Sequence, residues 1–212
     1  MALLDDISQN LQDGRAKTVK ELVRQAIDEG MGAETILNDG LLKGMGIIGG
    51  KFKRDEVYVP DVLIAARAMK AGSEMLKPLL AQAGVQAVGK VVLGTVEGDL
   101  HDIGKNLVGM MMEGKGLEVI DIGIDQPPES FINAAIENDV KIIACSALLT
   151  TTMGAIEGVI KAAKDAGIRD KVTFMIGGAP VTDTFCKQIG ADVYSPDAAS
   201  AAEAAYSICV GN

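Results

Sequence analysis

The chain has 212 residues, of which 48% are hydrophobic, and it carries a formal net charge of −9 at pH 7. This length allows two modest hydrophobic cores, while the acidic balance excludes the basic surface on which nucleic-acid binding depends. No apolar run approaches the roughly 18 residues of a membrane-spanning segment, and the first residues lack the pattern of a signal peptide. The cysteines are odd in number and lack the spacing of metal ligands, so we expect them to be reduced thiols. We therefore expect a cytoplasmic protein that binds neither nucleic acid nor membrane.

The residues before about position 85 show the apolar spacing of amphipathic helices. Apolar side chains recur at helical intervals in 22–27 and 62–69, and the same spacing in the flanking segments predicts four helices. The sequence Tyr58-Val59-Pro60-Asp61 marks the start of the last helix, because proline is favoured in a first turn. Helices joined by short connections form an antiparallel bundle. We expect a four-helix bundle domain over residues 1–85 that ends in a linker at 82–86.

The remaining residues, 88–212, alternate short β-rich runs with helical patterns. This alternation predicts a five-stranded parallel sheet with helices on both faces, in a Rossmann-like or flavodoxin-like order. The expected strands are residues 90–96, 118–122, 140–146, 172–177 and 191–194. The expected helices are residues 106–113, 128–138, 153–165, 181–189 and 198–207.

His101 is the only histidine of the chain and lies in Asp99-Leu100-His101-Asp102-Ile103-Gly104, just after the expected strand 90–96. It is therefore expected on a loop at the carboxyl end of a strand, where open α/β sheets bind their ligands. A neutral imidazole with one nitrogen held by a carboxylate is well suited to bind a metal. Asp99 or Asp102 could supply that carboxylate. On composition alone, a solvated histidine in an acidic turn is an equally good interpretation.

Two glycine motifs are similar to nucleotide-binding motifs but do not fit the structural context that such motifs need. Gly44-Met45-Gly46-Ile47-Ile48-Gly49 has the spacing of a dinucleotide fingerprint, yet it lies inside a helical pattern, which favours close helix packing instead. The segment Gly98 to Gly104, followed by Lys105-Asn106, is similar to a phosphate-binding loop. It has one residue too many between the glycines and lacks the hydroxyl that would hold magnesium. Neither motif predicts a nucleotide site.

Three short motifs together resemble the cobalamin-binding signature of the methionine synthase type of B12 domain. They are Asp-x-His-x-x-Gly at 99–104, Ser-x-Leu at 146–148, and the pair Gly177-Gly178, each after an expected strand. The similarity extends without a gap from Gly94 to Asn106. The helical half resembles the cap domain that precedes this B12 domain in methionine synthase and in the corrinoid proteins of methyltransferase systems. The resemblance implies a cobalamin cofactor, as methylcobalamin or another corrinoid.

The resemblance also implies roles for individual residues. His101 would be the lower axial ligand of cobalt in place of the cofactor's benzimidazole, and Asp99 would accept the other imidazole N–H. Thr152 stands where methionine synthase has a serine that extends this pair. Loop contacts to the cofactor would come from Gly98, Leu100, Asp102, Ile103 and Gly104, and contacts to its tail from Ser146, Leu148, Thr150, Gly177, Gly178 and, more weakly, Ala198. The cap would cover the corrin with Phe52, Tyr58, Val59 and Val62, for which ordinary bundle core is the alternative.

The expected function is that of a methyl carrier in one-carbon metabolism. The sequence shows no barrel domain and no zinc cluster that would activate a methyl donor or acceptor, so a complete enzyme is not expected. The resemblance implies three partners: a donor-specific methyltransferase, a methyl-acceptor methyltransferase and a reductive activase. A B12-dependent sensor or regulator is the alternative, although such proteins usually carry a basic DNA-binding module. A cofactor fragment of methionine synthase or a small mutase subunit is a third interpretation, and the helical cap argues against the mutase.

Overall fold

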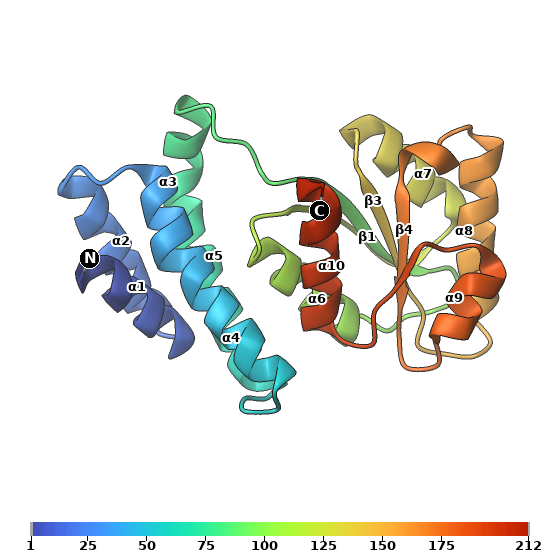
Figure 1. Ribbon diagram of the computed structural model, residues 1–212, viewed down its shortest axis with the longest axis horizontal. Helices are drawn as coiled ribbons and strands as arrows, with labels where there is room; N and C mark the ends of the chain where they lie inside the picture. Colours follow the sequence, from blue (N-terminus) through green and yellow to red (C-terminus); the bar gives the residue numbers. More distant parts are fainter. Residues whose placement is uncertain (1, 212) are drawn as a thin grey trace. The chain divides into compact units, whose positions relative to one another are not determined.

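The computed structural model describes residues 2–211, which divide into a helical unit, made mainly of residues before Val88, and an α/β unit that begins there (Figure 1). Among these residues, no helix combines the length and the apolar character needed to cross a lipid bilayer. Each unit has its own core, and each is described below by itself.

The helical unit contains the four predicted helices within the described residues. They are α1 (Ala2–Gln12), α2 (Ala16–Asp28), a third helix over residues 33–53, and α5 (Val59–Gln82). In α2 the buried residues Val19, Val23 and Ala26 recur at helical spacing, which explains why this segment folds onto its neighbours. At the start of α5, Pro60 lies in the first turn and the Asp61 carboxylate accepts the Tyr58 N–H at 2.9 Å.

The third helix differs from the predicted regular one. It consists of α3 (Ala33–Thr35), the π-helical segment η1 (Ile36–Leu42) and α4 (Lys43–Lys53). Within α4, a Cβ on Gly44 would lie 2.9 Å from the Ser8 carbonyl oxygen of α1. This glycine therefore allows two helices to approach closely, which is the packing role expected for the glycine motif at 44–49.

The α/β unit is a parallel five-stranded sheet within the described residues, in the order β2-β1-β3-β4-β5. The strands are β1 (Lys90–Val96), β2 (Glu118–Gln126), β3 (Ile142–Ser146), β4 (Thr173–Gly177) and β5 (Val193–Tyr194). The helices are α6 (Ile103–Glu113), α7 (Pro128–Asn138), α8 (Met153–Asp165), α9 (Asp183–Ile189) and α10 (Ala198–Val210), with the short 3₁₀ turn η2 (Arg169–Lys171). Of the two predicted orders, the structure shows the flavodoxin-like one.

Helices cover both faces of this sheet: α6 and α10 lie on one face, and α7 and α8 on the other (Figure 1). The core on the α7 and α8 side includes the completely buried Phe131, Phe174 and Ile143. All three cysteines are free and buried, with Cys145 and Cys186 in this core. Burial raises the pKa of the Cys145 thiol, so this side chain behaves as an apolar core residue.

The carboxyl ends of the central strands are aligned, whereas β2 is irregular. Thr95 of β1 pairs with Ser146 of β3, which in turn pairs with Gly177 of β4. The pairing of β1 with β2 shifts register on either side of Gly94, and Gly123 and Asp125 have positive φ angles of 91° and 52°. The expected strand 118–122 therefore stops too early, because β2 continues through Gly123 to Gln126.

Candidate functional site

Two loops at the carboxyl edge of the sheet form the candidate site. The first connects β1 to α6 over residues 97–102, and the second connects β3 to α8 over residues 147–152. The strands β1 and β3 are neighbours, but α6 and α8 leave toward opposite faces of the sheet (Figure 1). The two loops therefore diverge at the point where α/β sheets of this topology bind ligands.

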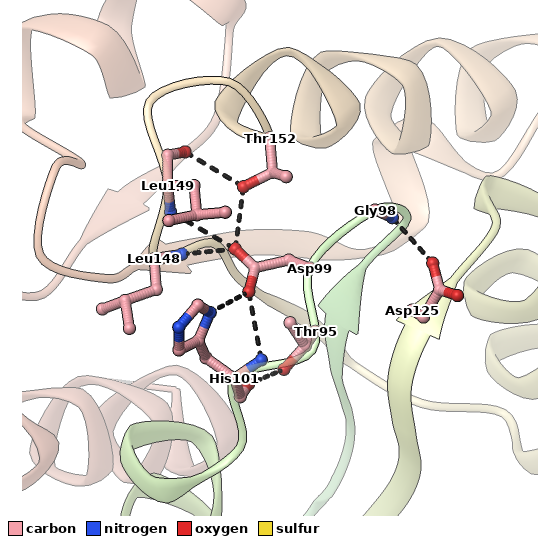
Figure 2. A network of polar contacts seen from close by, with 8 residues as sticks. All are labelled: Thr95, Gly98, Asp99, His101, Asp125, Leu148, Leu149 and Thr152. Atoms are coloured by element: carbon pink, nitrogen blue, oxygen red, sulfur yellow. Dashed lines mark hydrogen bonds and ion pairs between the residues drawn. The ribbon is translucent and has the colours of Figure 1, made fainter.

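The Asp99 carboxylate joins these loops, although its side chain is completely buried (Figure 2). Its Oδ1 lies 2.7 Å from His101 Nδ1 and accepts the His101 backbone N–H at 3.1 Å. Its Oδ2 accepts the backbone N–H groups of Leu148 and Leu149 at 2.7 and 3.3 Å, and the Thr152 hydroxyl at 2.7 Å. Of the two carboxylates expected beside the imidazole, Asp99 is the one in contact with it.

The protonation state of Asp99 determines the tautomer of His101. Burial by itself raises the pKa of Asp99, but hydrogen bonds from the Leu148 amide, His101 and Thr152 outweigh it and hold the pKa well below its ordinary value. The carboxylate is therefore ionised and acts only as an acceptor. Nδ1 of His101 must then donate the hydrogen bond, which leaves the lone pair of a neutral imidazole on Nε2.

The outer nitrogen of His101 is free to bind a ligand. The side chain is 50% exposed, and Nε2 has no hydrogen-bond partner among the described residues. Large apolar side chains of the same two loops and of the first turn of α6 are also exposed: Leu100 by 67%, Ile103 by 73% and Leu148 by 41%. Exposed apolar side chains in segments that carry an unpaired polar atom are typical of a surface that a ligand covers.

This donor set fits a metal whose remaining ligands come from a macrocycle. No group of three or more histidine, cysteine, aspartate or glutamate side chains that could hold a metal ion occurs within residues 2–211. A single imidazole nitrogen can complete the coordination of a metal already held by a ring such as a corrin, and the carboxylate on its other nitrogen fixes ring orientation. The apolar side chains beside His101 suit an apolar ring. The residues present therefore fit a corrinoid.

The remaining loop residues have local structural roles. Gly98, with φ of 81°, donates its N–H to Asp125 Oδ1 at 2.7 Å. Asp102 is exposed and accepts a hydrogen bond from the Asn106 side chain at 3.1 Å. Gly104 lies in the first turn of α6, and a Cβ there would meet nothing within 4 Å.

Most residues expected around the cofactor tail lie at the ends of β3 and β4 or in the loops that follow them, and Ala198 lies at the start of α10. Ser146 and Gly177 are the last residues of their strands, Thr150 is exposed in the β3–α8 loop, and the buried Ala198 begins α10. Gly178 has a φ of 126°, and a Cβ there would lie 1.8 Å from the Ala147 carbonyl oxygen. Position 178 therefore requires glycine because Ala147, in the loop after β3, lies so close to it, whether or not a ligand binds there.

The four expected cap residues belong to the helical unit, and their exposure differs. Tyr58 is 71% exposed, Phe52 and Val59 are half-buried, and Val62 is completely buried in α5. For Val62 the structure shows the burial of an ordinary core residue. The exposed Tyr58 has the accessibility that a ligand contact requires.

Three residues at the site were not singled out from the sequence. The buried Thr95 donates its hydroxyl to the His101 carbonyl oxygen at 2.8 Å, and Leu149 contributes only a backbone N–H (Figure 2). Asp125 receives the Gly98 N–H from the end of β2. A hydroxyl within the apolar run of β1 was a usable signal for Thr95. Backbone donors carry no side-chain signal. Asp125 lies beyond Ile122, the residue at which the expected strand ended.

Comparison with known proteins gives consistent matches along the whole chain. Residues 89–205 match a family described as B12 binding domain, and residues 3–77 match a second family of the same description.

A corrinoid protein of Desulfitobacterium hafniense is 41% identical over 211 residues, which cover 98% of each chain. The dimethylamine corrinoid protein of Methanosarcina barkeri is 40% identical over 201 residues, covering 93% of this chain and 94% of the relative. The crystal structure of the methanol:cobalamin methyltransferase complex from Methanosarcina barkeri aligns with a TM-score of 0.91 and 32% identity, covering 100% of this chain and 81% of that chain.

Proposed function

Because this chain belongs to the B12-binding family of corrinoid proteins in methyltransferase systems, we propose that it holds cobalamin in the base-off form, with His101 on cobalt, and carries a methyl group between partner enzymes. Its cofactor is a cobalamin or related corrinoid. When bound, the corrinoid supplies a cobalt centre that accepts and releases a methyl group. The observation that carries the proposal is the Asp99–His101 contact of 2.7 Å, which commits Nδ1 and leaves Nε2 available.

The protein's own residues would hold the imidazole ready for coordination. Asp99 orients the ring and makes it a better ligand, since a carboxylate on one ring nitrogen raises the basicity of the other. The Leu148 amide and Thr152 hydroxyl keep that carboxylate ionised and in place. Leu100, Ile103 and Leu148 would cover the ring around the metal and keep water from it.

The partners are proposed from the relatives. One relative is named for dimethylamine, and a solved relative is part of a methanol:cobalamin methyltransferase complex. We propose that a donor-specific methyltransferase loads this protein, that a methyl-acceptor methyltransferase unloads it, and that a reductive activase restores oxidised cobalt. A carrier is proposed over a complete enzyme because relatives that match nearly the whole chain are named corrinoid proteins.

The single histidine makes the proposed coordination directly testable. Untagged protein labelled with ¹⁵N-histidine is reconstituted with unlabelled cobalamin, and the cob(II)alamin form is examined by electron paramagnetic resonance. We expect the cobalt lines to be split into triplets in unlabelled protein and into doublets in labelled protein, because the axial nitrogen has changed its nuclear spin. His101→Ala should lose this difference. Triplets in both preparations would show that the cofactor's own base remains bound, and would contradict the proposal.

The carrier role needs a second measurement. Protein loaded with isotopically labelled methylcobalamin is incubated with a methyl-acceptor enzyme from a related system, and transfer of the label is followed. Transfer supports the carrier. Cobalamin binding that changes the oligomeric state, with no transfer to any partner, would favour the sensor alternative.

A further inference from the structure

We infer that Asp125 is a positioning residue for His101, acting from β2 on the backbone of the histidine loop. The inference rests on the proposed coordination by His101 and adds a second anchor to it. Asp125 never contacts the imidazole itself. It acts through Gly98 and Asp99, the residues at the start of the loop (Figure 2).

Two hydrogen bonds in opposite directions join Asp125 to this loop. The Gly98 N–H donates to Asp125 Oδ1 at 2.7 Å, and the Asp125 N–H donates to the Asp99 carbonyl oxygen at 3.0 Å. The first is charge-assisted, and bonds of this kind are stronger than bonds between neutral groups. Together they fix the peptide groups on either side of the Gly98–Asp99 peptide bond, immediately before Leu100 and His101.

The backbone of β2 is bent where it meets the loop. Asp125 has a φ of 52°, in the left-handed region that side chains other than glycine seldom adopt. Aspartate tolerates this region better than most residues. The irregularity lies next to Gly123, also at positive φ, and beside the register shifts between β1 and β2. The strand thus leaves its regular path at the position from which Asp125 contacts Gly98.

The two neighbours of β1 therefore hold the histidine loop in different ways. On the β3 side, the Leu148 amide and the Thr152 hydroxyl hold the Asp99 side chain. On the β2 side, Asp125 holds the Asp99 main chain. If hydrogen bonds held only the side chain of Asp99, a rotation of its backbone could still change the direction of the carboxylate. Fixing both ends of Asp99 keeps its Oδ1 facing His101 Nδ1.

Asp125→Gly is the informative variant, because it keeps the left-handed backbone accessible and removes only the carboxylate. Asp139→Gly is the matched control. Asp139 also has a left-handed φ, of 50°, but it ends α7, and no hydrogen bond links its carboxylate to the histidine loop within the described residues. Asp125→Asn retains an acceptor oxygen of the same shape and should restore most of the function.

The readouts are the fraction of histidine-coordinated cob(II)alamin in the ¹⁵N-histidine spectrum and the affinity for hydroxocobalamin. We expect Asp125→Gly to lower the histidine-coordinated fraction and to weaken binding by about three- to tenfold. Asp139→Gly should match the parent in both readouts, and Asp125→Asn should lie close to it. Hydrogen exchange of cofactor-free protein should show faster exchange in residues 97–102 for Asp125→Gly only.

The outcomes distinguish a failure of the inference from a failure of the proposed function. If the parent shows histidine coordination and Asp125→Gly equals Asp139→Gly in the spectrum, in affinity and in loop exchange, the inference is overturned while the proposed function stands. If the parent itself shows no histidine coordination, the proposed function fails and the inference fails with it. The inference is supported if Asp125→Gly lowers the histidine-coordinated fraction and the affinity, and Asp125→Asn restores them. A general loss of stability would not depend on whether the side chain has an acceptor oxygen.

Discussion

At the residue scale, Asp99 shows how a buried carboxylate is tolerated at this site. An isolated charge in a protein interior costs far more than a protein's net stability, so it survives only with hydrogen-bond donors around it. Asp99 has donors on both oxygens, and no buried side-chain nitrogen or oxygen of the described residues lacks a partner. The charge is thus part of the folded structure before any cofactor arrives.

The Thr152 hydroxyl has two acceptors, Asp99 Oδ2 at 2.7 Å and the Leu149 carbonyl at 3.0 Å. Thr152→Val keeps the shape but removes the donor from a buried charge, so we expect it to lower the free energy of unfolding by about 1–3 kcal/mol. Thr152→Ser keeps the hydroxyl and should lie much closer to the parent. Urea unfolding measures both, and an equal loss in the two variants would show that the methyl group, rather than the hydrogen bond, matters.

The sequence singled out only part of the hydrogen-bond network around Asp99. The motif resemblance pointed to Asp99, His101 and Thr152, and the structure joins these three by hydrogen bonds. Leu149 and Asp125 escaped notice for a physical reason. One acts through a backbone amide, and the other through a loop contact that only the folded sheet creates.

At the scale of elements, the sequence placed those with clear boundary signals well. Helices α7 and α8 have the predicted bounds, as does strand β1. The π segment η1 was missed, because its buried residues Ile36 and Gly40 are four positions apart, an interval that an α-helix also shows. Helix α6 begins at Ile103, three residues earlier than the expected start at 106, because Ile103, Gly104 and Lys105 show no apolar periodicity.

An ion pair with one buried and one exposed partner links α6 to β2. The Lys105 ammonium, whose side chain is 2% exposed, contacts Asp121 Oδ2 and donates to the Asn106 side chain at 2.8 Å. The Asp121 side chain is 43% exposed, so water reaches one partner and not the other. Replacing Asp121 and replacing Lys105 should therefore have unequal effects on the free energy of unfolding.

We expect Asp121→Asn to destabilise the protein by about 1–3 kcal/mol, because it leaves the buried Lys105 charge without its counter-ion. Lys105→Met should cost less than about 1 kcal/mol, since Asp121 can be hydrated and methionine fills much of the same space. Thermal or urea unfolding of both variants, with the double variant to measure coupling, tests this order. Equal losses would mean that the pair contributes through packing rather than charge.

At the scale of the whole molecule, the site is complete in polar contacts within the α/β unit. Every hydrogen bond to Asp99 and His101 described above comes from residues 95–152. The helical unit has its own core and carries Tyr58 as an exposed aromatic side chain. A change in apolar periodicity near residue 85 is the sequence signal from which we expect two domains.

The segment between the units should be the first to yield to proteolysis. Helix α5 ends at Gln82, and residues 83–87, which include Ala83, Val85 and Ala87, are mostly exposed before β1 begins at Lys90. Exposed backbone without regular structure is cleaved preferentially. We expect limited elastase digestion to cut first within residues 83–88, as mass spectrometry of the fragments would show. A first cut in the connection at residues 54–58 would contradict this prediction.

The irregular path of β2 has a consequence beyond the histidine loop. An outer strand of a sheet offers unpaired backbone groups to any strand of another molecule, and short, charged or bent edges discourage such pairing. Here β5 is only Val193–Tyr194, and β2, the other outer strand, carries Asp121, Asp125 and the left-handed Gly123. Asp125, which we infer to position the histidine loop from β2, thus also helps to prevent this open edge from pairing with another molecule.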